Sequence, residues 1–217
     1  MAERSAVRAY HSPRREEQSR ATRAAILDSA RALFTERGYA ATTVAAIAER
    51  AGVVPDTVYA SVGRKPALFR QLVESAVWGG VEPVLPESSE YAGRVRRVSD
   101  PRAKLAIYAG AVRAISERMA PLHAVLRAAA GQDPELARMH EEIGTLRSHD
   151  TRLFAAHLAR IDGVRADLDV DEITDVLWMT NSAEVYVMLV QERGWGPDRY
   201  EKWLADSWCR LLLDPPA

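Results

Sequence analysis

Apolar residues recur every three or four positions along most of this chain, which is the period of an amphipathic helix. Between residues 17 and 37 the period is regular, and Gly38 follows where a helix often ends in a left-handed residue. The pattern therefore predicts a helix over 17–37 that stops at a glycine. Its apolar stripe consists of Ile26, Leu27, Ala30, Leu33 and Phe34.

Two shorter apolar patterns follow, separated by a tight turn at residues 51–53. Thr42 or Thr43 can cap the first of them, which predicts a helix over 43–50. Pro55 suits the first turn of the second, predicted over 55–61, because its missing N–H is not needed there. This spacing predicts a helix-turn-helix, whose second helix enters the DNA major groove.

The rest of the chain keeps the helical period and shows neither a convincing strand nor an internal repeat. Residues 79–101 are rich in Gly, Pro and Ser, and this composition predicts a loop. The expected fold is all-α, with about nine helices. The remaining predicted helices cover residues 64–79, 105–119, 121–131, 136–161, 173–190 and 197–213.

Charge is unevenly distributed along the chain. Of 217 residues, 47% are hydrophobic and 27% are charged, which is ordinary for a globular protein. Residues 1–70 carry 12 Lys and Arg against 7 Asp and Glu, whereas residues 71–217 carry 17 against 23. A basic N-terminal third followed by an acidic remainder is typical of a nucleic-acid-binding protein with a separate sensing domain.

Secreted and membrane proteins are disfavoured as classes. The first residues contain no apolar core of a secretory signal, and no segment approaches the roughly 20 apolar residues that span a bilayer. The single cysteine, Cys209, excludes an intramolecular disulfide. We therefore expect a cytoplasmic protein with no membrane segment.

Residues 22–70 resemble the DNA-binding region of the TetR family of one-component transcriptional repressors. Many positions match in one register, so the resemblance is more specific than a short motif. The matching residues are Ile26, Leu27, Ala30, Leu33, Phe34, Gly38, Tyr39, Thr42, Thr43, Val44, Ile47, Ala48, Ala51, Gly52, Val53, Thr57, Tyr59, Lys65, Leu68 and Phe69. The resemblance implies a three-helix DNA-binding domain, here 21–70, and a helical domain for ligand binding and dimerisation, here 71–217.

The same resemblance implies that Thr43, Tyr59 and Lys65 hold the DNA phosphate backbone. Their chemistry agrees, since a hydroxyl at a helix start, a phenol and an ammonium all bind phosphate oxygens. Arg64, beside Lys65, strengthens this site. The residues expected to face the groove are Pro55, Thr57 and Ala60.

The sequence departs from the family pattern at positions that read bases. Ala45 and Ala46 stand where many relatives place polar or basic residues, and residues 60–62 lack the usual aromatic pair. Residues 1–20 show no apolar period and are predicted to form a flexible basic arm. We expect arginines of this arm to compensate by entering a minor groove or holding phosphates. These are Arg14, Arg15 and Arg20.

Two predicted helices near the C-terminus, 173–190 and 197–213, carry more apolar surface than one buried stripe requires. Aromatic and Met residues such as Trp178, Met188 and Trp203 suit a protein interface. The resemblance implies a homodimer made by these two helices and their symmetry mates. Such a dimer would bind a palindromic double-stranded operator with half-sites about 34–36 Å apart.

The resemblance also implies a pocket for a small-molecule effector, which we expect to be hydrophobic or aromatic. A largely apolar cavity with a few polar groups is the usual form of such a site. The candidate lining residues are Trp78, Tyr108, Val112, Leu122, Leu126, Met139, Ile143, Phe154 and Trp178. Polar groups on or beside these faces are His123, His140, Asp150, His157, Asn181 and Glu184.

No motif in the sequence supports catalysis. The Glu-x-x-His pairs of di-iron bundles, H-E-x-x-H, G-x-S-x-G and the phosphate-binding G-x-x-x-x-G-K-[ST] are all absent. The sequence therefore predicts no catalytic residue, metal or cofactor. It predicts a DNA-binding transcriptional regulator, and the resemblance implies a repressor released from its operator by the effector. Two alternatives stay open: a sensor of this fold that has lost DNA binding, and an all-helical enzyme.

Overall fold

The computed structural model describes residues 13–79 and 90–215. In these ranges the chain forms ten α-helices and one π-helical segment, and its β-structure is limited to an isolated bridge between Val164 and Leu213. The all-α prediction is confirmed. The contacts divide the chain into two compact units, the first ending at Phe69 and the second beginning at Arg70. None of the described helices is both long and apolar enough to cross a lipid bilayer.

The first unit contains α1 (Pro13–Ala41), α2 (Val44–Arg50), α3 (Pro55–Val62) and the first turn of α4 (Lys65–Trp78). Inside α1 the backbone of Gly38 has φ 78°, so the helical path is interrupted where the sequence predicts its end. A side chain with a Cβ adopts this conformation only with strain, and glycine avoids that cost. The turn brings the chain back toward the start of α2.

An aromatic trio forms much of the first unit's core. The Phe34 ring is fully buried, stacks on Tyr39 at 5.5 Å between centroids, and meets Phe69 edge-on at 5.1 Å. The buried Thr42 hydroxyl donates to the backbone oxygens of Leu33 and Gly38, at 3.1 and 2.8 Å. These contacts hold the end of α1 against Phe69 of α4 and fix the turn that leads into α2.

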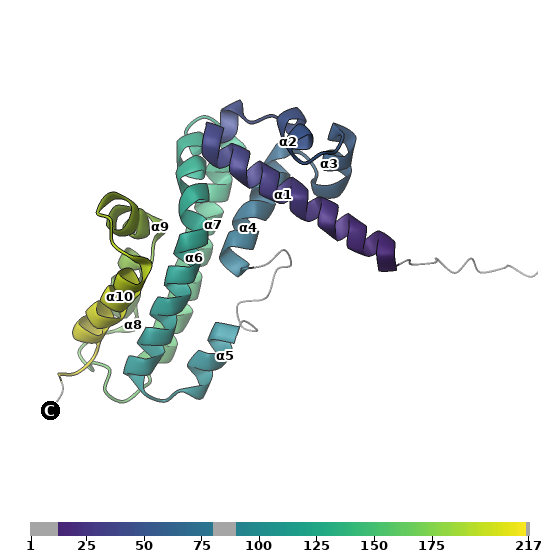
Figure 1. Ribbon diagram of the computed structural model, residues 1–217. Helices are drawn as coiled ribbons and strands as arrows, with labels where there is room; N and C mark the ends of the chain where they lie inside the picture. Colours follow the sequence, from purple (N-terminus) through teal and green to yellow (C-terminus); the bar gives the residue numbers. More distant parts are fainter. Residues whose placement is uncertain (1–12, 80–89, 216–217) are drawn as a thin grey trace, which may run out of the picture. The chain divides into compact units, whose positions relative to one another are not determined.

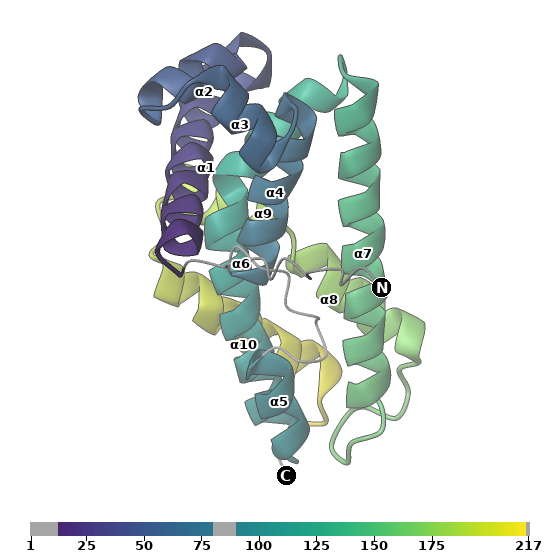
Figure 2. The same cartoon turned by 90° about the vertical axis from the view of Figure 1, so that its right-hand side faces the viewer.

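The second unit contains the rest of α4 and all the later helices. Within it α6 contacts both α7 and α10, and α7 contacts α8, an arrangement that the turned view also shows (Figure 2). The bounds are α5 (Glu90–Arg97), α6 (Pro101–Ala130), α7 (Pro134–Leu158), α8 (Val170–Thr180), α9 (Ala183–Tyr186), the π-helical η2 (Val187–Glu192) and α10 (Pro197–Leu212).

Two predictions for the second unit are wrong. Helix α5 lies inside the segment expected to be a loop, and is held by its buried Val95, whose backbone oxygen accepts a hydrogen bond from the buried Lys104 ammonium of α6. The helices expected at 105–119 and 121–131 form the single helix α6, with Pro121 inside it. Buried residues on both sides of the proline, such as Ala120 and Leu122, offset the hydrogen bond that it removes.

The helix expected over 173–190 is also interrupted. It divides at Asn181 and Ser182 into α8, α9 and η2. The Asn181 amide nitrogen donates to the Tyr108 hydroxyl and to Thr151 Oγ1, at 2.8 and 2.9 Å. Ser182 then caps α9 through the backbone N–H of Val185, 3.3 Å away. Side-chain hydrogen bonds of this kind compete with helix continuation.

Candidate functional site

The helix-turn-helix forms as predicted. Thr43 is the cap of α2, and its hydroxyl oxygen accepts from the backbone N–H of Ala46 at 3.1 Å. Gly52 has φ 69° in the turn, and Pro55 stands in the first turn of α3. Val58 is fully buried, so the opposite face of α3 is turned to solvent.

The predicted DNA-contacting residues around α2 and α3 lie mostly on that solvent face. Tyr59 is 51% exposed, so about half of this large aromatic side chain is accessible to solvent. Thr57 is half-buried beside it. The other exposed members of the set are Thr43, Pro55, Ala60 and Arg64.

Lys65 has a second role that the sequence does not reveal. Its ammonium lies 4.1 Å from the centre of the Tyr39 ring, within reach of a cation–π interaction, and the residue is half-buried at the start of α4. The contact orients the ammonium and links it to the aromatic trio. Lys65 is therefore positioned by the core of the first unit.

Two residues missed at the sequence level shape the same surface. Arg23 of α1 donates from Nη1 to the backbone oxygen of Ser61 at 2.7 Å, which fixes the C-terminal end of α3. A cation also suits the negative end of a helix dipole. Val54, just before α3, is 62% exposed and adds an apolar contact point. The sequence indicated this exposed valine, because only one of the adjacent side chains of Val53 and Val54 can fill the turn.

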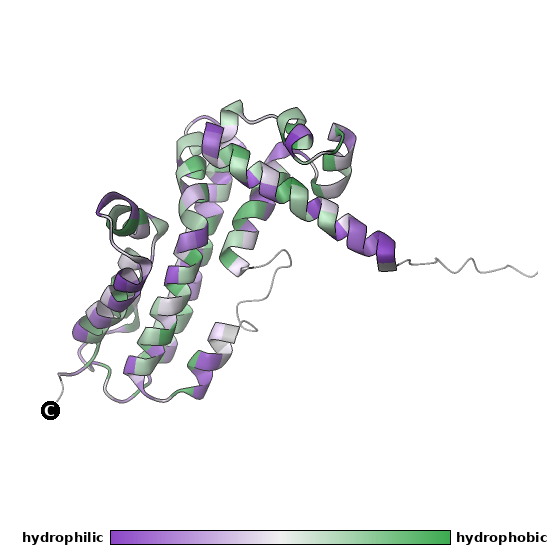
Figure 3. Cartoon of the chain, viewed as in Figure 1, coloured by the Kyte–Doolittle hydropathy of each residue, from purple (hydrophilic) through white to green (hydrophobic). Residues whose placement is uncertain are grey.

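The arm prediction is wrong for residues 13–20. Helix α1 begins at Pro13, so the three predicted arginines stand on a helix and not in a flexible arm. All three are exposed, in a hydrophilic stretch at the start of α1 (Figure 3). Glu16 in the first turn and the favourable propensity of Arg and Glu explain why this polar segment is helical. Residues 1–12 of the predicted arm lie outside the described residues. The three arginines are Arg14, Arg15 and Arg20.

In the second unit, three of the nine predicted ligand-lining residues fall in one buried cluster: Tyr108, Val112 and Phe154. The Tyr108 ring stacks on Phe154 at 4.2 Å and on Trp208 at 5.2 Å. Leu122, Leu126 and Met139 are also buried, while Trp78 and Ile143 are half-buried. Trp178 differs from the rest, because it is 42% exposed on α8 with the Arg147 guanidinium 4.4 Å above its ring.

A polar network lies beside this aromatic cluster. Arg147 of α7 donates from Nη1 to Asn181 Oδ1 at 2.6 Å and to the backbone oxygen of Trp178 at 2.7 Å. Burial lowers the pKa of Arg147 and raises that of Tyr108, whose hydroxyl accepts from Asn181. The network ties α6 and α7 to the break that follows α8.

His123, His140 and Glu184 form a second polar group. His123 Nε2 lies 3.1 Å from Glu184 Oε1, and the two histidine rings are 5.9 Å apart. The contact with His123 is the main cause that lowers the pKa of Glu184 to about 2. His157, the remaining predicted histidine, lies elsewhere, with Nε2 3.1 Å from Lys104 Nζ.

Replacement of Glu184 by glutamine is expected to lower stability at neutral pH more than in acid. A carboxyl whose pKa is lower in the folded chain stabilises it above the unfolded value of 4.5, and that contribution is lost as the pH falls toward 2. Glu184 is half exposed, so solvent screening reduces the effect to about one or two degrees in Tm. Thermal melts at neutral pH and near pH 3 test this, with Glu141→Gln as control. An equal Tm difference at both pH values would contradict it.

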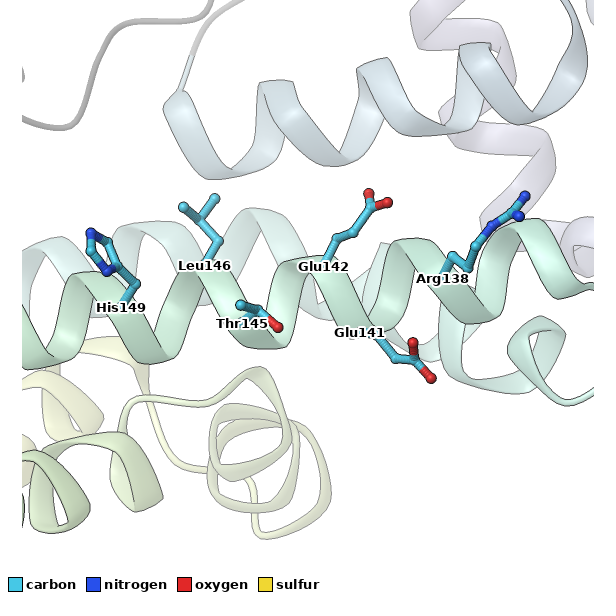
Figure 4. A pocket seen from close by; sticks show the side chains of 6 residues that line it. All are labelled: Arg138, Glu141, Glu142, Thr145, Leu146 and His149. Carbon is cyan, nitrogen blue, oxygen red and sulfur yellow. The ribbon is translucent and has the colours of Figure 1, made fainter.

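An open hollow follows the surface of α7. Figure 4 shows Arg138 at one end and His149 at the other, with Glu142 and Leu146 projecting to one side and Glu141 to the opposite side. None of the nine predicted ligand residues lines it. Its full lining is Arg138, Glu141, Glu142, Thr145, Leu146 and His149.

Comparisons with known proteins agree with this architecture. Residues 26–72 match the family model described as bacterial regulatory proteins, tetR family. No curated protein matches the chain.

Solved structures share the fold over most of the chain. NalD, the secondary repressor of the MexAB-OprM multidrug efflux pump in Pseudomonas aeruginosa, is 23% identical, with a TM-score of 0.68 over 92% of this chain and 100% of NalD. The fatty acid degradation regulator FadR from Bacillus halodurans is 17% identical, with a TM-score of 0.62 over 86% of this chain and 94% of FadR. A transcriptional regulator from Saccharomonospora viridis, solved in complex with choline, is 15% identical, with a TM-score of 0.66 over 89% and 98%.

At these identities the neighbours establish the fold, and the family model identifies the helix-turn-helix within it. Residues 26–72 are thus similar to the DNA-binding region of the tetR family, and the chain as a whole shares the fold of these regulators.

Proposed function

We propose that the chain is a homodimeric repressor, without catalytic activity, that binds a palindromic operator and leaves it when a small hydrophobic or aromatic effector binds. The observation that carries DNA binding is the exposure of Tyr59 on α3, a helix whose Val58 is fully buried, together with the exposure of Thr43 and Arg64 in the same unit. An exposed phenol, hydroxyl and guanidinium suit contacts with the phosphate backbone.

Base recognition in this proposal is modest. Pro55, Thr57 and Ala60 offer methyl and methylene groups, which suit thymine methyls and supply few hydrogen bonds. Arg14, Arg15 and Arg20 then add phosphate or minor-groove contacts from the start of α1, where they are exposed. Affinity would therefore depend strongly on salt.

The proposed dimer uses the outer faces of α8, η2 and α10. Four large apolar side chains are solvent-exposed there: Trp178 (42%), Met179 (61%), Met188 (47%) and Leu211 (45%). Aromatic and Met side chains of this kind are enriched in protein interfaces. This region includes the two segments that the family resemblance assigns to dimerisation.

The proposed effector site lies in the second unit, around the aromatic cluster of Tyr108, Phe154 and Trp208. NalD and FadR are named for an efflux pump and for fatty acid degradation, and the Saccharomonospora regulator binds choline. These names support a small organic effector. To release DNA, it must bind one conformation of the dimer more tightly than the other.

Fluorescence anisotropy with duplexes from the region upstream of its own gene tests the DNA-binding proposal. We expect two chains per palindromic duplex and a loss of about tenfold in affinity for Tyr59→Ala or Lys65→Ala, because each removes a phosphate contact. Lys65→Ala should also reduce the slope of log K against log salt by about one.

The exposed Arg193→Ala serves as the control and should leave affinity unchanged. Saturable binding that neither Tyr59→Ala nor Lys65→Ala weakens would contradict the assignment of this surface. Failure of every upstream duplex to bind would favour a sensor that has lost DNA binding, which Ala45 and Ala46 would then explain.

A further inference from the structure

Val54 has the most exposed of the large apolar side chains that the structure describes. Its exposed fraction is 62%, and Tyr59, at 51%, is the other such side chain in the described part of the first unit. Tyr59 has a phenol that can bind phosphate, whereas the side chain of Val54 ends in two methyl groups. Single exposed apolar residues are common on protein surfaces, so exposure alone does not distinguish Val54 from an ordinary surface residue.

Backbone hydrogen bonds fix the position of Val54 at the entry of α3. Val53 is half-buried, and its N–H donates to the backbone oxygen of Ala48 at 3.0 Å, which closes the turn after α2. The backbone oxygen of Val54 accepts from the N–H of Thr57 at 3.0 Å and so begins α3. Val53 therefore occupies the turn, and the side chain of Val54 is left in solvent.

Valine is an unusual residue at this position. Val54 is the N-cap of α3, with φ −85° and ψ 154°, and no side chain caps this helix. Serine, threonine, aspartate and asparagine are preferred at an N-cap because their side-chain oxygen accepts a backbone N–H, and valine is among the poorest choices. Thr43 shows the preferred arrangement at the start of α2. Val54 thus adds neither to the core nor to the cap, and departures from local rules are expected at functional positions.

We propose that Val54 contacts the methyl group of a thymine in the DNA major groove and so contributes to the choice of operator. The inference rests on the proposed DNA binding and adds a base-reading residue to it. In a helix-turn-helix, the N-terminal residues of the second helix contact the base edges. Val54 stands directly before the first residue of that helix, Pro55.

The chemistry of the side chain selects thymine. Valine has no polar group in its side chain, so it cannot form hydrogen bonds with the edges of the other bases. The thymine methyl is the apolar group that a base pair presents in the major groove. Contact between this methyl and Val54 removes apolar surface of both partners from water. Thymine should therefore be favoured about fourfold over a pyrimidine that lacks the methyl group.

Fluorescence anisotropy with uracil-substituted duplexes tests this contact, because uracil differs from thymine only by the missing methyl. The duplex is one from the region upstream of the gene or, if none binds, one selected from a randomised pool. Each thymine is replaced in turn, in both half-sites together. For the wild type we expect at least one position where uracil weakens binding about tenfold to twentyfold, the product of a fourfold effect in each half-site.

Val54→Ser should abolish the effect of uracil at that position, and Val54→Ile should retain it, because isoleucine keeps the apolar contact. Thr57→Ser is the matched control, since it removes a methyl group from the same helix. It should leave the effect of uracil at the Val54 position unchanged. Such a pairing between one methyl on the protein and one on the DNA is what a double-mutant cycle isolates.

Hydrogen exchange of α3 separates base reading from a structural role. A serine at an N-cap stabilises its helix relative to valine, so Val54→Ser should slow the exchange of the α3 amides by about fivefold. The same variant should lose its sensitivity to uracil. If Val54 served only to hold α3 in place, its replacement would make these amides exchange faster.

Four outcomes would overturn the proposal. Three of them leave DNA binding intact: no effect of uracil on the wild type, the same effect in Val54→Ser at every position, and loss of the effect in Thr57→Ser as well as in Val54→Ser. Each of these, with affinity still dependent on Tyr59, would reject only the thymine contact. The fourth, failure of both upstream and selected duplexes to bind, would reject the proposed DNA binding and the thymine contact with it.

Discussion

Replacement of Phe34 by alanine is expected to unfold the first unit, which contains the helix-turn-helix, and to abolish DNA binding. Phe34 is fully buried and contacts both Tyr39 and Phe69, so the change removes the centre of the aromatic trio. Truncation of a buried Phe typically costs about 3–5 kcal/mol. Native domains have only about 5–15 kcal/mol in total, so a large share of this small unit's stability is lost. Hydrogen exchange of peptides from α1 to α3 measures the effect on this unit alone.

Tyr59→Ala supplies the contrast, since it removes an aromatic ring of similar size from the same unit. Tyr59 is 51% exposed, so its loss should leave hydrogen exchange of α1–α3 unchanged while still weakening DNA binding. Both variants should therefore bind DNA more weakly, but only Phe34→Ala should lose protection of its backbone amides against hydrogen exchange. If Phe34→Ala exchanged as slowly as the wild type, the aromatic trio could not be the core of this unit.

The helix-turn-helix was predictable because its signals are local. Thr43 caps a helix, Gly52 permits a positive φ and Pro55 starts the next helix, each for reasons contained within a few residues. The periodic apolar positions agree with these signals, and Val58 and Ile47 are both fully buried. Local preference and tertiary packing thus favour the same structure in this unit.

The second unit was less predictable because distant contacts decide its boundaries. Pro121 would end an isolated helix, yet it lies inside α6, where buried residues continue on both sides. Asn181 interrupts the predicted 173–190 helix through bonds to Tyr108 and Thr151, which are 73 and 30 residues away in the chain. Apolar periodicity cannot indicate where such a polar contact forms.

The candidate sites show the same limit. Exposure of Tyr59 and burial of Tyr108 and Phe154 follow from helical period alone. The hydrogen bonds of Arg147 to Asn181 and to the Trp178 backbone do not, because they form where the helical period is interrupted after α8. The sequence indicated Asn181 as one polar group among six, and its contacts with Tyr108 and Thr151 distinguish it.

Replacement of Trp208 by alanine is the second change with a large expected effect, here on the second unit. Trp208 is fully buried in α10, stacks on Tyr108 and donates from Nε1 to Thr180 Oγ1 at 2.7 Å. We expect the free energy of unfolding to fall by about 3–5 kcal/mol, from the lost apolar contacts and the cavity left behind. Urea denaturation followed by far-UV circular dichroism measures it without relying on the tryptophan signal.

Trp203→Ala is the matched control, because it removes the same residue type from the same helix at a half-buried position. It should cost clearly less than Trp208→Ala, in proportion to the smaller area buried. Trp208→Phe should recover most of the loss and leave a deficit of about 1–2 kcal/mol, because the ring is restored while Thr180 loses its donor. Thr180→Val combined with Trp208→Phe should cost less than the sum of the two single changes, since both remove the same hydrogen bond. If Trp203→Ala and Trp208→Ala lowered the free energy of unfolding equally, the buried indole of Trp208 would have no special role in stabilising α10.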